Sequence, residues 1–595
     1  MISRERRDAL RGEARATRRR NLFVGGSALL LVLVACISTT VGGGLWLARL
    51  LRGDPAETLL QQTPSWAVDS AELTIAVSPV MAPVLQEFAN QFNSQDHRTP
   101  DDKKMTVWIV PTISEQMVEQ ALGLPNFQAI APDSSLWIDQ LEAEWAARQD
   151  AQAEESQIPI SQRRTGTPVR VAVSPIVVAA WQDVARELGW PDQPVGWQEI
   201  QRKATDDPNF KWNHPATNNA AGLLATLAEF YAGAGLTRGL TVDAATDEAT
   251  LAYVQAVEAT VRFYGEGEEV ITQRLAEEGR NFLDAFVAQE RVVIEWNRTH
   301  GDDPLVAIYP AEGTLWTDHP LALLELGAQA HELAVTDNQR LTFRAFTDFL
   351  LTPDSQRRFL QTGYRPADLA IELDAPGSPF AETDAVNWRE PQTTLQMPPP
   401  SVIEVVQNVW YYTKRPTNVY LVVDTSGSME GAKIARTREA LAAFVQQIQG
   451  DRDRLGLIEF ASGTKNFVPL RVMDDNNRRD TLTLIDNMDA LGGTALVDAV
   501  YAAAEDLLAQ GDASAINAIV VMTDGQENES YYRLNDLERL LSGNQPGRPV
   551  IFTIAFGRDA DEPLLSEMAR IGQGQFRRAD ETDIEELYRI ISTYF

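Results

Sequence analysis

Residues 419–429 read VYLVVDTSGSM, a charge-free hydrophobic run that ends in a turn rich in hydroxyl groups. A strand without charge is typical of the centre of a parallel sheet, where both faces of the strand are buried. The turn puts the carboxylate of Asp424 and the hydroxyls of Ser426 and Ser428 at the carboxyl end of this strand. This stretch therefore predicts an α/β fold with a polar site at one edge of its sheet.

The sequence that follows repeats the alternation of strand and helix. Lys433 to Ile448 has amphipathic helical spacing. Further buried strands, each followed by a helix, are expected over Leu455–Phe460, Ile516–Met522 and Val550–Ala555. Such repetition predicts a doubly wound, Rossmann-like open sheet over residues 418–595, which would bind ligands at the carboxyl ends of its strands.

Two further loops carry oxygen-bearing side chains in matching places. Gly492-Gly493-Thr494 opens the helix expected from Ala495, and Thr523-Asp524-Gly525 directly follows the 516–522 strand. This set of D-x-S-x-S, T and T-D-G motifs resembles the metal-ion-dependent adhesion site of the von Willebrand factor A family. The resemblance implies that Ser426, Ser428 and Thr494 bind the ion directly, while Asp424 and Asp524 act partly through water.

The donor types indicate which ion such a site would hold. Hydroxyl and carboxylate oxygens are hard ligands that suit Mg²⁺ or Mn²⁺ better than zinc or copper. The resemblance implies that a carboxylate from a partner protein completes the coordination. A D-x-S-x-S string alone is a common turn, so the interpretation depends on the three loops meeting at one point.

The N-terminal region predicts a membrane anchor. The first twenty residues hold eight arginines against three acidic residues, and residues 22–48 carry no charge. A run of this length can cross a bilayer, and the arginine bias places the N-terminus in the cytoplasm. We therefore expect a basic cytoplasmic tail (1–21), a transmembrane segment (22–48) and a polar linker (49–70). An alternative stays open, because Leu33–Cys36 resembles a bacterial lipobox in which Cys36 would be lipidated.

Residues 71–390 show a repeated pattern. Leu73–Val77 reads as a strand, followed by Ser78-Pro79 and a helix over Met81–Phe92. The pattern recurs as a strand over Val169–Val173, then Ser174-Pro175 and a helix over Ile176–Leu188. These stretches resemble a two-lobed bacterial extracellular solute-binding domain of the periplasmic-binding-protein type. The resemblance implies a small solute held in a cleft between the lobes.

The candidate cleft residues lie where helices are expected to begin. Exposed amides at a helix N-terminus form an anion site, which selects Ser78, Ser134, Ser135, Ser174 and Asn218. The alternative for each of them is an ordinary helix cap. Trp296 and Tyr309 are further candidates for the cleft wall, with a place in the core as their alternative.

Two other segments read as connectors between folded parts. Leu141–Gln157 is acidic and helix-prone, and residues 391–417 combine a proline-rich stretch at Pro398–Pro400 with a short lead-in helix. The second segment is expected to be a stiff boundary before the C-terminal domain.

Composition excludes several classes of function. The net charge of −32 argues against a general nucleic-acid binder, and the single cysteine, Cys36, excludes an intramolecular disulfide. The sequence has neither a G-x-x-x-x-G-K-[ST] phosphate loop nor a nucleophile with an evident base, so no enzymatic activity is expected.

Together these features predict a membrane-anchored extracytoplasmic binding protein. It would capture a protein or acidic ligand through the divalent cation, and a small solute in the cleft. The alternative is a solute receptor of a transporter, whose adhesion-type domain docks onto an assembly.

Overall fold

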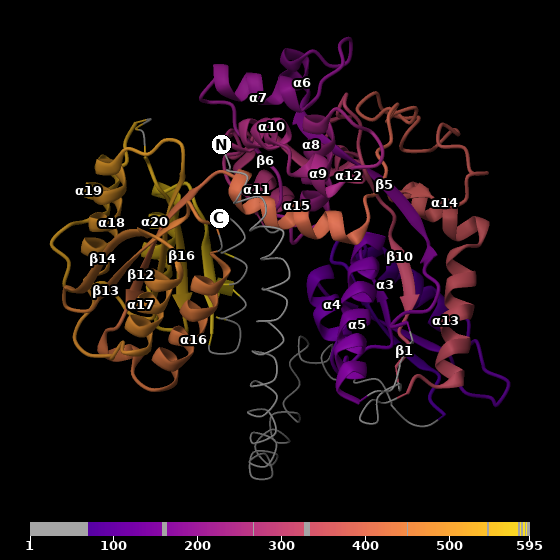
Figure 1. The fold of residues 1–595 in the computed structure, drawn as a ribbon, viewed down its shortest axis with the longest axis horizontal. Helices are drawn as coiled ribbons and strands as arrows, with labels where there is room; N and C mark the ends of the chain where they lie inside the picture. The colour runs from indigo at the N-terminus through magenta and orange to yellow at the C-terminus, as the bar shows by residue number, and fades with distance from the viewer. Residues whose placement is uncertain are drawn as a thin grey trace. The chain divides into compact units, whose positions relative to one another are not determined.

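The computed structural model describes residues 69–595, except for 157–162, 266, 327–333, 449, 544, 546, 581–583, 585–586, 589–590 and 592–595. Contacts divide the chain into two compact units (Figure 1). The first comprises Met1–Trp197, Thr217–Thr250 and Ala285–Asn408, and the second comprises Gln198–Ala216, Leu251–Asp284 and Val409–Phe595. The tail, transmembrane segment and most of the linker predicted before residue 69 lie outside the described residues. Among the residues that are described, no helix is long and apolar enough to cross a membrane.

The first unit contains a mixed sheet with the strand order β2-β1-β3-β10-β4. Its strands are β1 (Glu72–Val77), β2 (Thr106–Pro111), β3 (Ala129–Ala131), β4 (Val169–Arg170) and β10 (Pro320–Leu323). The accompanying helices are α3 (Ala82–Ser94), α4 (Ser114–Ala121), α5 (Ser135–Ser156), α13 (Asp337–Leu350) and α14 (Pro353–Gln361). The strand and helix predicted on either side of Ser78-Pro79 are confirmed. The acidic stretch after Leu141 is no connector, because it belongs to α5, whose Trp137, Leu141 and Trp145 are buried.

A long strand, β5 (Ala172–Trp181), is the centre of the second sheet of this unit. It pairs antiparallel with β7 (Ala285–Gln289), β8 (Leu305–Ile308), β9 (Trp316–Thr317) and β11 (Arg365–Pro366). The helix predicted from Ile176 is therefore wrong, since α6 covers only Gln182–Leu188. A short apolar run fits a buried strand as well as a helix, and here the β-branched residues 176–178 pair with strands on both sides. The remaining helices are α8 (Ala220–Ala234), α9 (Val242–Ala245) and α12 (Glu290–Thr299).

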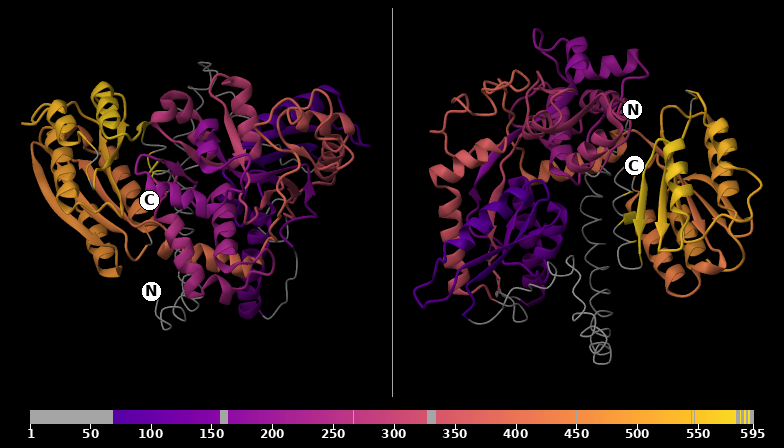
Figure 2. Two further views of the ribbon diagram at one scale, coloured as in Figure 1. Left: turned by 90° about the horizontal axis from the view of Figure 1, so that it is seen from above. Right: turned by 180° about the vertical axis from the view of Figure 1, so that it is seen from behind.

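The second unit contains a six-stranded sheet with the order β14-β13-β12-β15-β16-β17. Its strands are β12 (Thr417–Asp424), β13 (Arg454–Phe460), β14 (Thr464–Val472), β15 (Ile516–Thr523), β16 (Val550–Phe556) and β17 (Phe576–Ala579). All neighbours are parallel except β13 and β14. Helices lie on both faces (Figure 2): α16 (Ala432–Gln447), α17 (Asp475–Asp486), α18 (Leu496–Gln510), α19 (Leu534–Leu540) and α20 (Glu562–Ile571).

The doubly wound sheet and its four predicted strands are confirmed. The expectation that each strand is followed by a helix is wrong for β13, which turns back into β14 as an antiparallel edge strand. That strand is largely exposed, and its apolar residues are flanked by polar and charged ones, so it lacks the long buried run that marks its neighbours. Alternate residues of β12, such as Tyr420 and Val422, enter one core with Leu496 and Val500 of α18.

The second unit also holds the segments 198–216 and 251–284, which are tied to the sheet by a buried carboxylate. They contain β6 (Trp212–Asn213), α11 (Glu268–Glu278) and most of α7 (Trp197–Asp206) and α10 (Glu248–Glu258). Glu258 accepts hydrogen bonds from the indole of Trp410 (2.6 Å) and the hydroxyl of Tyr264 (2.7 Å). Trp410 lies in the last turns of α15 (Pro400–Thr413), the lead-in helix predicted before β12.

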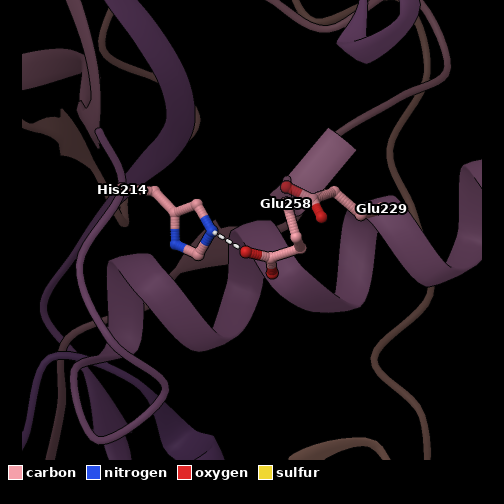
Figure 3. A group of neighbouring side chains, drawn as sticks. All are labelled: His214, Glu229 and Glu258. Atoms are coloured by element: carbon pink, nitrogen blue, oxygen red, sulfur yellow. Dashed lines mark hydrogen bonds and ion pairs between the residues drawn. The ribbon is translucent and has the colours of Figure 1, made fainter. Parts of the chain in front are cut away.

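The third partner of Glu258 is His214, whose Nε2 lies 3.2 Å from Glu258 Oε2 (Figure 3). Its other nitrogen, Nδ1, lies 2.7 Å from the carbonyl oxygen of Pro215. Because a carbonyl only accepts, Nδ1 carries a proton, and the contact with Glu258 requires a second proton shared by the pair. This buried hydrogen-bonded group fixes the 198–216 and 251–284 segments of the unit to the helix that leads into the sheet.

Candidate metal centre

The site forms where two adjacent parallel strands end. Asp424 is the last residue of β12 and Thr523 is the last residue of β15. The two strands pair in register through Val423 and Met522. Their carboxyl ends therefore meet at one edge of the sheet, and this brings the carboxylates of Asp424 and Asp524 to the same place.

A chain of hydrogen bonds joins the first loop to the third. The amide of Ser426 donates to Asp424 Oδ1 at 2.7 Å, which holds the turn after β12. The hydroxyls of Ser426 and Ser428 lie 3.0 Å apart, and Ser428 Oγ donates to Asp524 Oδ1 at 2.6 Å. Four of the five predicted oxygen ligands are thus connected directly.

The second loop brings the fifth ligand, Thr494, to the same point. Its backbone amide donates to Asn528 Oδ1 at 3.0 Å, and the carbonyl of Gly492 accepts from the amide of Gly427 at 3.0 Å. A β-carbon placed on Gly525 would lie 2.9 Å from Thr494 Oγ1, 3.5 Å from Ser428 Oγ and 3.6 Å from Asp424 Oδ2. Oxygen atoms of the first and second loops therefore surround the small space where a side chain of residue 525, in the third loop, would begin.

The electrostatics of this space are those of a buried anionic site. Asp424 and Asp524 are fully buried, and burial raises the pKa of Asp424, an effect that hydrogen bonds from Thr523 and Ser426 partly offset. Lys433, in the first turn of α16, forms an ion pair with Asp524 Oδ2. Ser428 is exposed, so the space is reachable from solvent.

These residues fit a hard divalent cation. The donors are two carboxylates and three hydroxyls, all oxygens, as Mg²⁺ and Mn²⁺ prefer. Their convergence on a space sized for a few atoms is the geometry that such an ion requires. The contact from Lys433 was missed, although its position one turn into the helix after the D-x-S-x-S loop could have signalled it.

The candidate cleft residues of the first unit fall into different settings. Ser78 lies in the loop between β1 and α3, and its buried hydroxyl has no hydrogen-bond partner among the described residues. Ser134 precedes α5 and accepts weakly from the amide of Leu136 (3.4 Å). The amide of Ser135 donates to Asp318 Oδ1 (2.7 Å). These three residues lie next to helix starts, as predicted.

Of the other two candidates, Ser174 differs from the prediction, whereas Asn218 lies directly before the cap residue of α8. Ser174 sits inside β5 rather than before a helix, and its hydroxyl accepts from the amide of Arg291 (3.4 Å). Asn218 is not the cap of α8, a role taken by Asn219, and the buried Asn218 Oδ1 has no partner within the described chain.

Aromatic and polar side chains that the sequence did not reveal link Ser78 to Ser174. The hydroxyl of Tyr364 donates to the carbonyl of Val80 (3.2 Å), and the guanidinium of Arg291 lies 5.1 Å over the Tyr364 ring. His319 packs edge-on against Tyr364 at 4.9 Å, and burial lowers the pKa of His319 to about 3. The imidazole is therefore neutral, and Arg291 connects the Tyr364 ring to Ser174, whose hydroxyl accepts from its amide.

The two aromatic candidates lie elsewhere. Trp296 is buried against Trp181 at 5.8 Å and donates to the carbonyl of Asp303 (3.1 Å), so it belongs to the core. Tyr309 hydrogen-bonds to the buried Glu290 and lines a cavity of about 1040 Å³ with Arg186, Trp190, Phe380 and Trp388. None of the five predicted polar cleft residues lines this cavity.

Two family models match the chain, the von Willebrand factor type A domain over residues 418–590 and the bacterial extracellular solute-binding protein over residues 73–365. The inter-alpha-trypsin inhibitor heavy chain H4 of Bos taurus is 31% identical over 175 residues, covering 28% of this chain and 19% of that protein. The Homo sapiens protein of the same name is 30% identical over 178 residues, with the same coverage. The chain spans about a fifth of the length of these curated relatives.

Solved structures match each part separately. A von Willebrand factor type A protein from Catenulispora acidiphila covers 30% of this chain and 42% of its own, with 20% identity and a TM-score of 0.27. The sulfate-binding protein SubI from Mycobacterium tuberculosis H37Rv covers 53% and 93%, with 17% identity and a TM-score of 0.36. The chain thus carries a bacterial extracellular solute-binding protein domain at residues 73–365 and a von Willebrand factor type A domain at residues 418–590.

Proposed function

We propose that the chain is a binding protein that captures a carboxylate of a partner protein on a divalent cation held by Asp424, Ser426, Ser428, Thr494 and Asp524. The observation that supports the proposal is the small space at Gly525, which oxygen atoms of Thr494, Ser428 and Asp424 from the other two loops surround. An ion in that space would keep coordination positions open toward solvent on the side of the exposed Ser428.

The charges of the site favour an anionic partner. Two carboxylates and the ammonium of Lys433 leave the site with a single negative charge, so a divalent ion makes it positive. A positive centre with replaceable water ligands attracts a carboxylate rather than a neutral group. The ion would bind and orient the partner.

The location of the protein follows from the sequence of residues 1–48. We propose that the uncharged run 22–48 anchors the chain in a membrane, with both folded units on the outer side; lipidation of Cys36 is the alternative anchor. The polar region around Ser78, Ser174 and His319 would take a small solute, and a transporter receptor is the alternative role for that part.

Partner capture tests the proposal. The full chain is immobilised in detergent and exposed to acidic peptides, with Mg²⁺ or with a chelator. We expect capture only with Mg²⁺, and its loss in Asp424→Ala and Thr494→Ala. Thr464→Ala, in the exposed β14, is the matched control and should behave as the wild type. Equal capture with and without the ion would contradict the proposal.

A further inference from the structure

A second cavity, of about 810 Å³, lies in the second unit at the edge of the sheet opposite the metal centre. Its lining includes Ile516 and Val550, the first residues of β15 and β16, and Arg415, two residues before β12. Asp424 and Asp524 lie at the other ends of these parallel strands. The cavity is therefore separate from the site of the proposed function.

The charge of the lining is unusual for this chain. It contains three arginines, Arg262, Arg415 and Arg548, and no aspartate, glutamate or lysine. The whole chain has a net charge of −32. Within the described part of the chain, none of the three arginines forms an ion pair, whereas several other arginines of this unit do so. A cluster of cations without ion pairs in an acidic protein indicates a site for an anion.

Hydrogen bonds hold the walls of the cavity together. Arg415 donates Nη1 to the carbonyl of Val261 (2.9 Å) and Nη2 to the carbonyls of Ala513 (2.9 Å) and Ala515 (3.1 Å). Arg262 Nη2 donates to Gln573 Oε1 (2.9 Å). Both contacts join the 251–284 segment to the sheet, so the arginines are held in place before any ligand binds.

The other two arginines keep donors for a ligand. Arg548 uses Nη2 for the carbonyl of Ile571 (3.1 Å) and makes no other side-chain hydrogen bond to the described residues. Arg262 makes one side-chain bond, to an amide oxygen. A guanidinium has five N–H donors arranged to bind phosphate or carboxylate oxygens in pairs. Arg415, by contrast, spends its donors on backbone carbonyls.

The arginines also destabilise one another in the absence of an anion. Burial, followed by the charges of Arg548 and Arg415, lowers the pKa of Arg262 to about 10. Burial likewise lowers the pKa of Arg548. A bound anion would offset this repulsion and the cost of burial together.

We propose that this cavity binds a small organic molecule that carries a phosphate or carboxylate group. Arg262 and Arg548 would hold the anionic group, with Gln573 and Asn517 as further polar neighbours. Phe210 and Pro549 offer an apolar wall for a carbon skeleton. The volume lies within the range of small-molecule sites.

Calorimetric titration of the full chain in detergent with pyrophosphate and with citrate tests this proposal. We expect saturable binding of at least one of them at near-physiological salt, and at least tenfold weaker binding by Arg262→Gln/Arg548→Gln. Tighter binding of pyrophosphate identifies a phosphate group as the ligand, and tighter binding of citrate identifies carboxylates. Arg578→Gln, which removes an exposed arginine paired with Glu562 on the same sheet, is the control and should bind as the wild type.

Two results would overturn the proposal. One is the absence of saturation by both anions in the wild type, and the other is equal affinity in the double variant. Near-UV circular dichroism checks that the double variant is folded. If its spectrum changes, the two single variants are titrated instead. Unchanged anion affinity in both single variants would then overturn the proposal.

Discussion

Ser428 Oγ lies 2.6 Å from Asp524 Oδ1, although 96 residues separate them in the chain. The contact joins the loop after β12 to the loop after β15, and these strands are neighbours in the sheet. Thr494 reaches the same space from a third loop, so the site depends on the folded sheet and not on any one motif.

Filling the space beside Gly525 should block the ion without removing a ligand. The β-carbon of Gly525→Ala would lie 2.9 Å from Thr494 Oγ1, inside the space where the donors meet. We expect at least tenfold weaker Mn²⁺ binding by calorimetry. Gly463→Ala places the same methyl group in open space within the same domain and should leave the affinity unchanged. An equal loss of Mn²⁺ affinity in both variants would show that the effect does not come from the space beside Gly525.

Lys433 should weaken the binding of the cation, and it should stabilise the site when no cation is bound. Its ammonium is paired with Asp524 Oδ2, one of the proposed ligands, and repels an incoming divalent ion. For Lys433→Met we expect roughly tenfold tighter Mn²⁺ binding and a lower unfolding temperature in chelator. Arg436→Met removes an exposed charge from the same helix and serves as the control. A fall in both the Mn²⁺ affinity and the unfolding temperature would mean that Lys433 only stabilises the structure.

The alternation of strand and helix in residues 418–595 was predictable, because its central strands are long, apolar and separated by amphipathic helices. The three loops of the metal centre were identified through their resemblance to the von Willebrand factor A motif, because no local pattern shows that loops so far apart in the chain meet. β14 was not, because an edge strand exposed on one side carries polar residues such as Thr464 and Asn466. The helix expected from Ile176 is instead the second half of β5, because an apolar run of this length has no period that distinguishes a strand from a helix. The cavity arginines come from segments some 290 residues apart, and no local pattern joins them.

Stability of the first unit should depend on the ionisation of Asp133. Burial raises the pKa of this carboxyl to about 6, despite hydrogen bonds from Ser114 (2.8 Å) and Trp137 (3.0 Å). The pKa of an aspartate in the unfolded chain is about 3.9, so the folded state binds this proton more tightly than the unfolded state does. The stability that the bound proton contributes is therefore lost as pH rises from about 4 through 6. The expected loss is roughly 2–3 kcal/mol.

Asp133→Asn keeps the accepting oxygen and removes the titration. Urea denaturation of both proteins near pH ~4 and pH ~7.5 measures the effect. From the lower to the higher pH, the unfolding free energy of the variant should rise by roughly 2–3 kcal/mol relative to that of the wild type. The same difference between the proteins at both pH values would contradict this assignment.

The buried ion pair of Arg365 and Glu290 should be far more sensitive than an exposed one. Arg365 donates Nη2 to Glu290 Oε1 (2.6 Å) and Nε to Oε2 (2.8 Å), and both side chains are almost fully buried. Arg365→Met leaves a carboxylate buried without its counter-charge and should cost about 3–5 kcal/mol in unfolding free energy. Arg340→Met breaks the half-exposed pair with Glu325 and should cost under about 1 kcal/mol. Similar costs for both would argue against the burial of the first pair.

The number of Mn²⁺ ions bound by the full chain tests the metal centre most directly. Electron paramagnetic resonance of the free ion, followed during titration, gives the stoichiometry and affinity without any partner. We expect one saturable Mn²⁺ per chain, displaced by Mg²⁺, and its loss in Thr494→Ala but not in Thr464→Ala. A wild type that binds no ion, or a Thr494→Ala variant that binds it equally well, would contradict the convergence of the three loops on one cation.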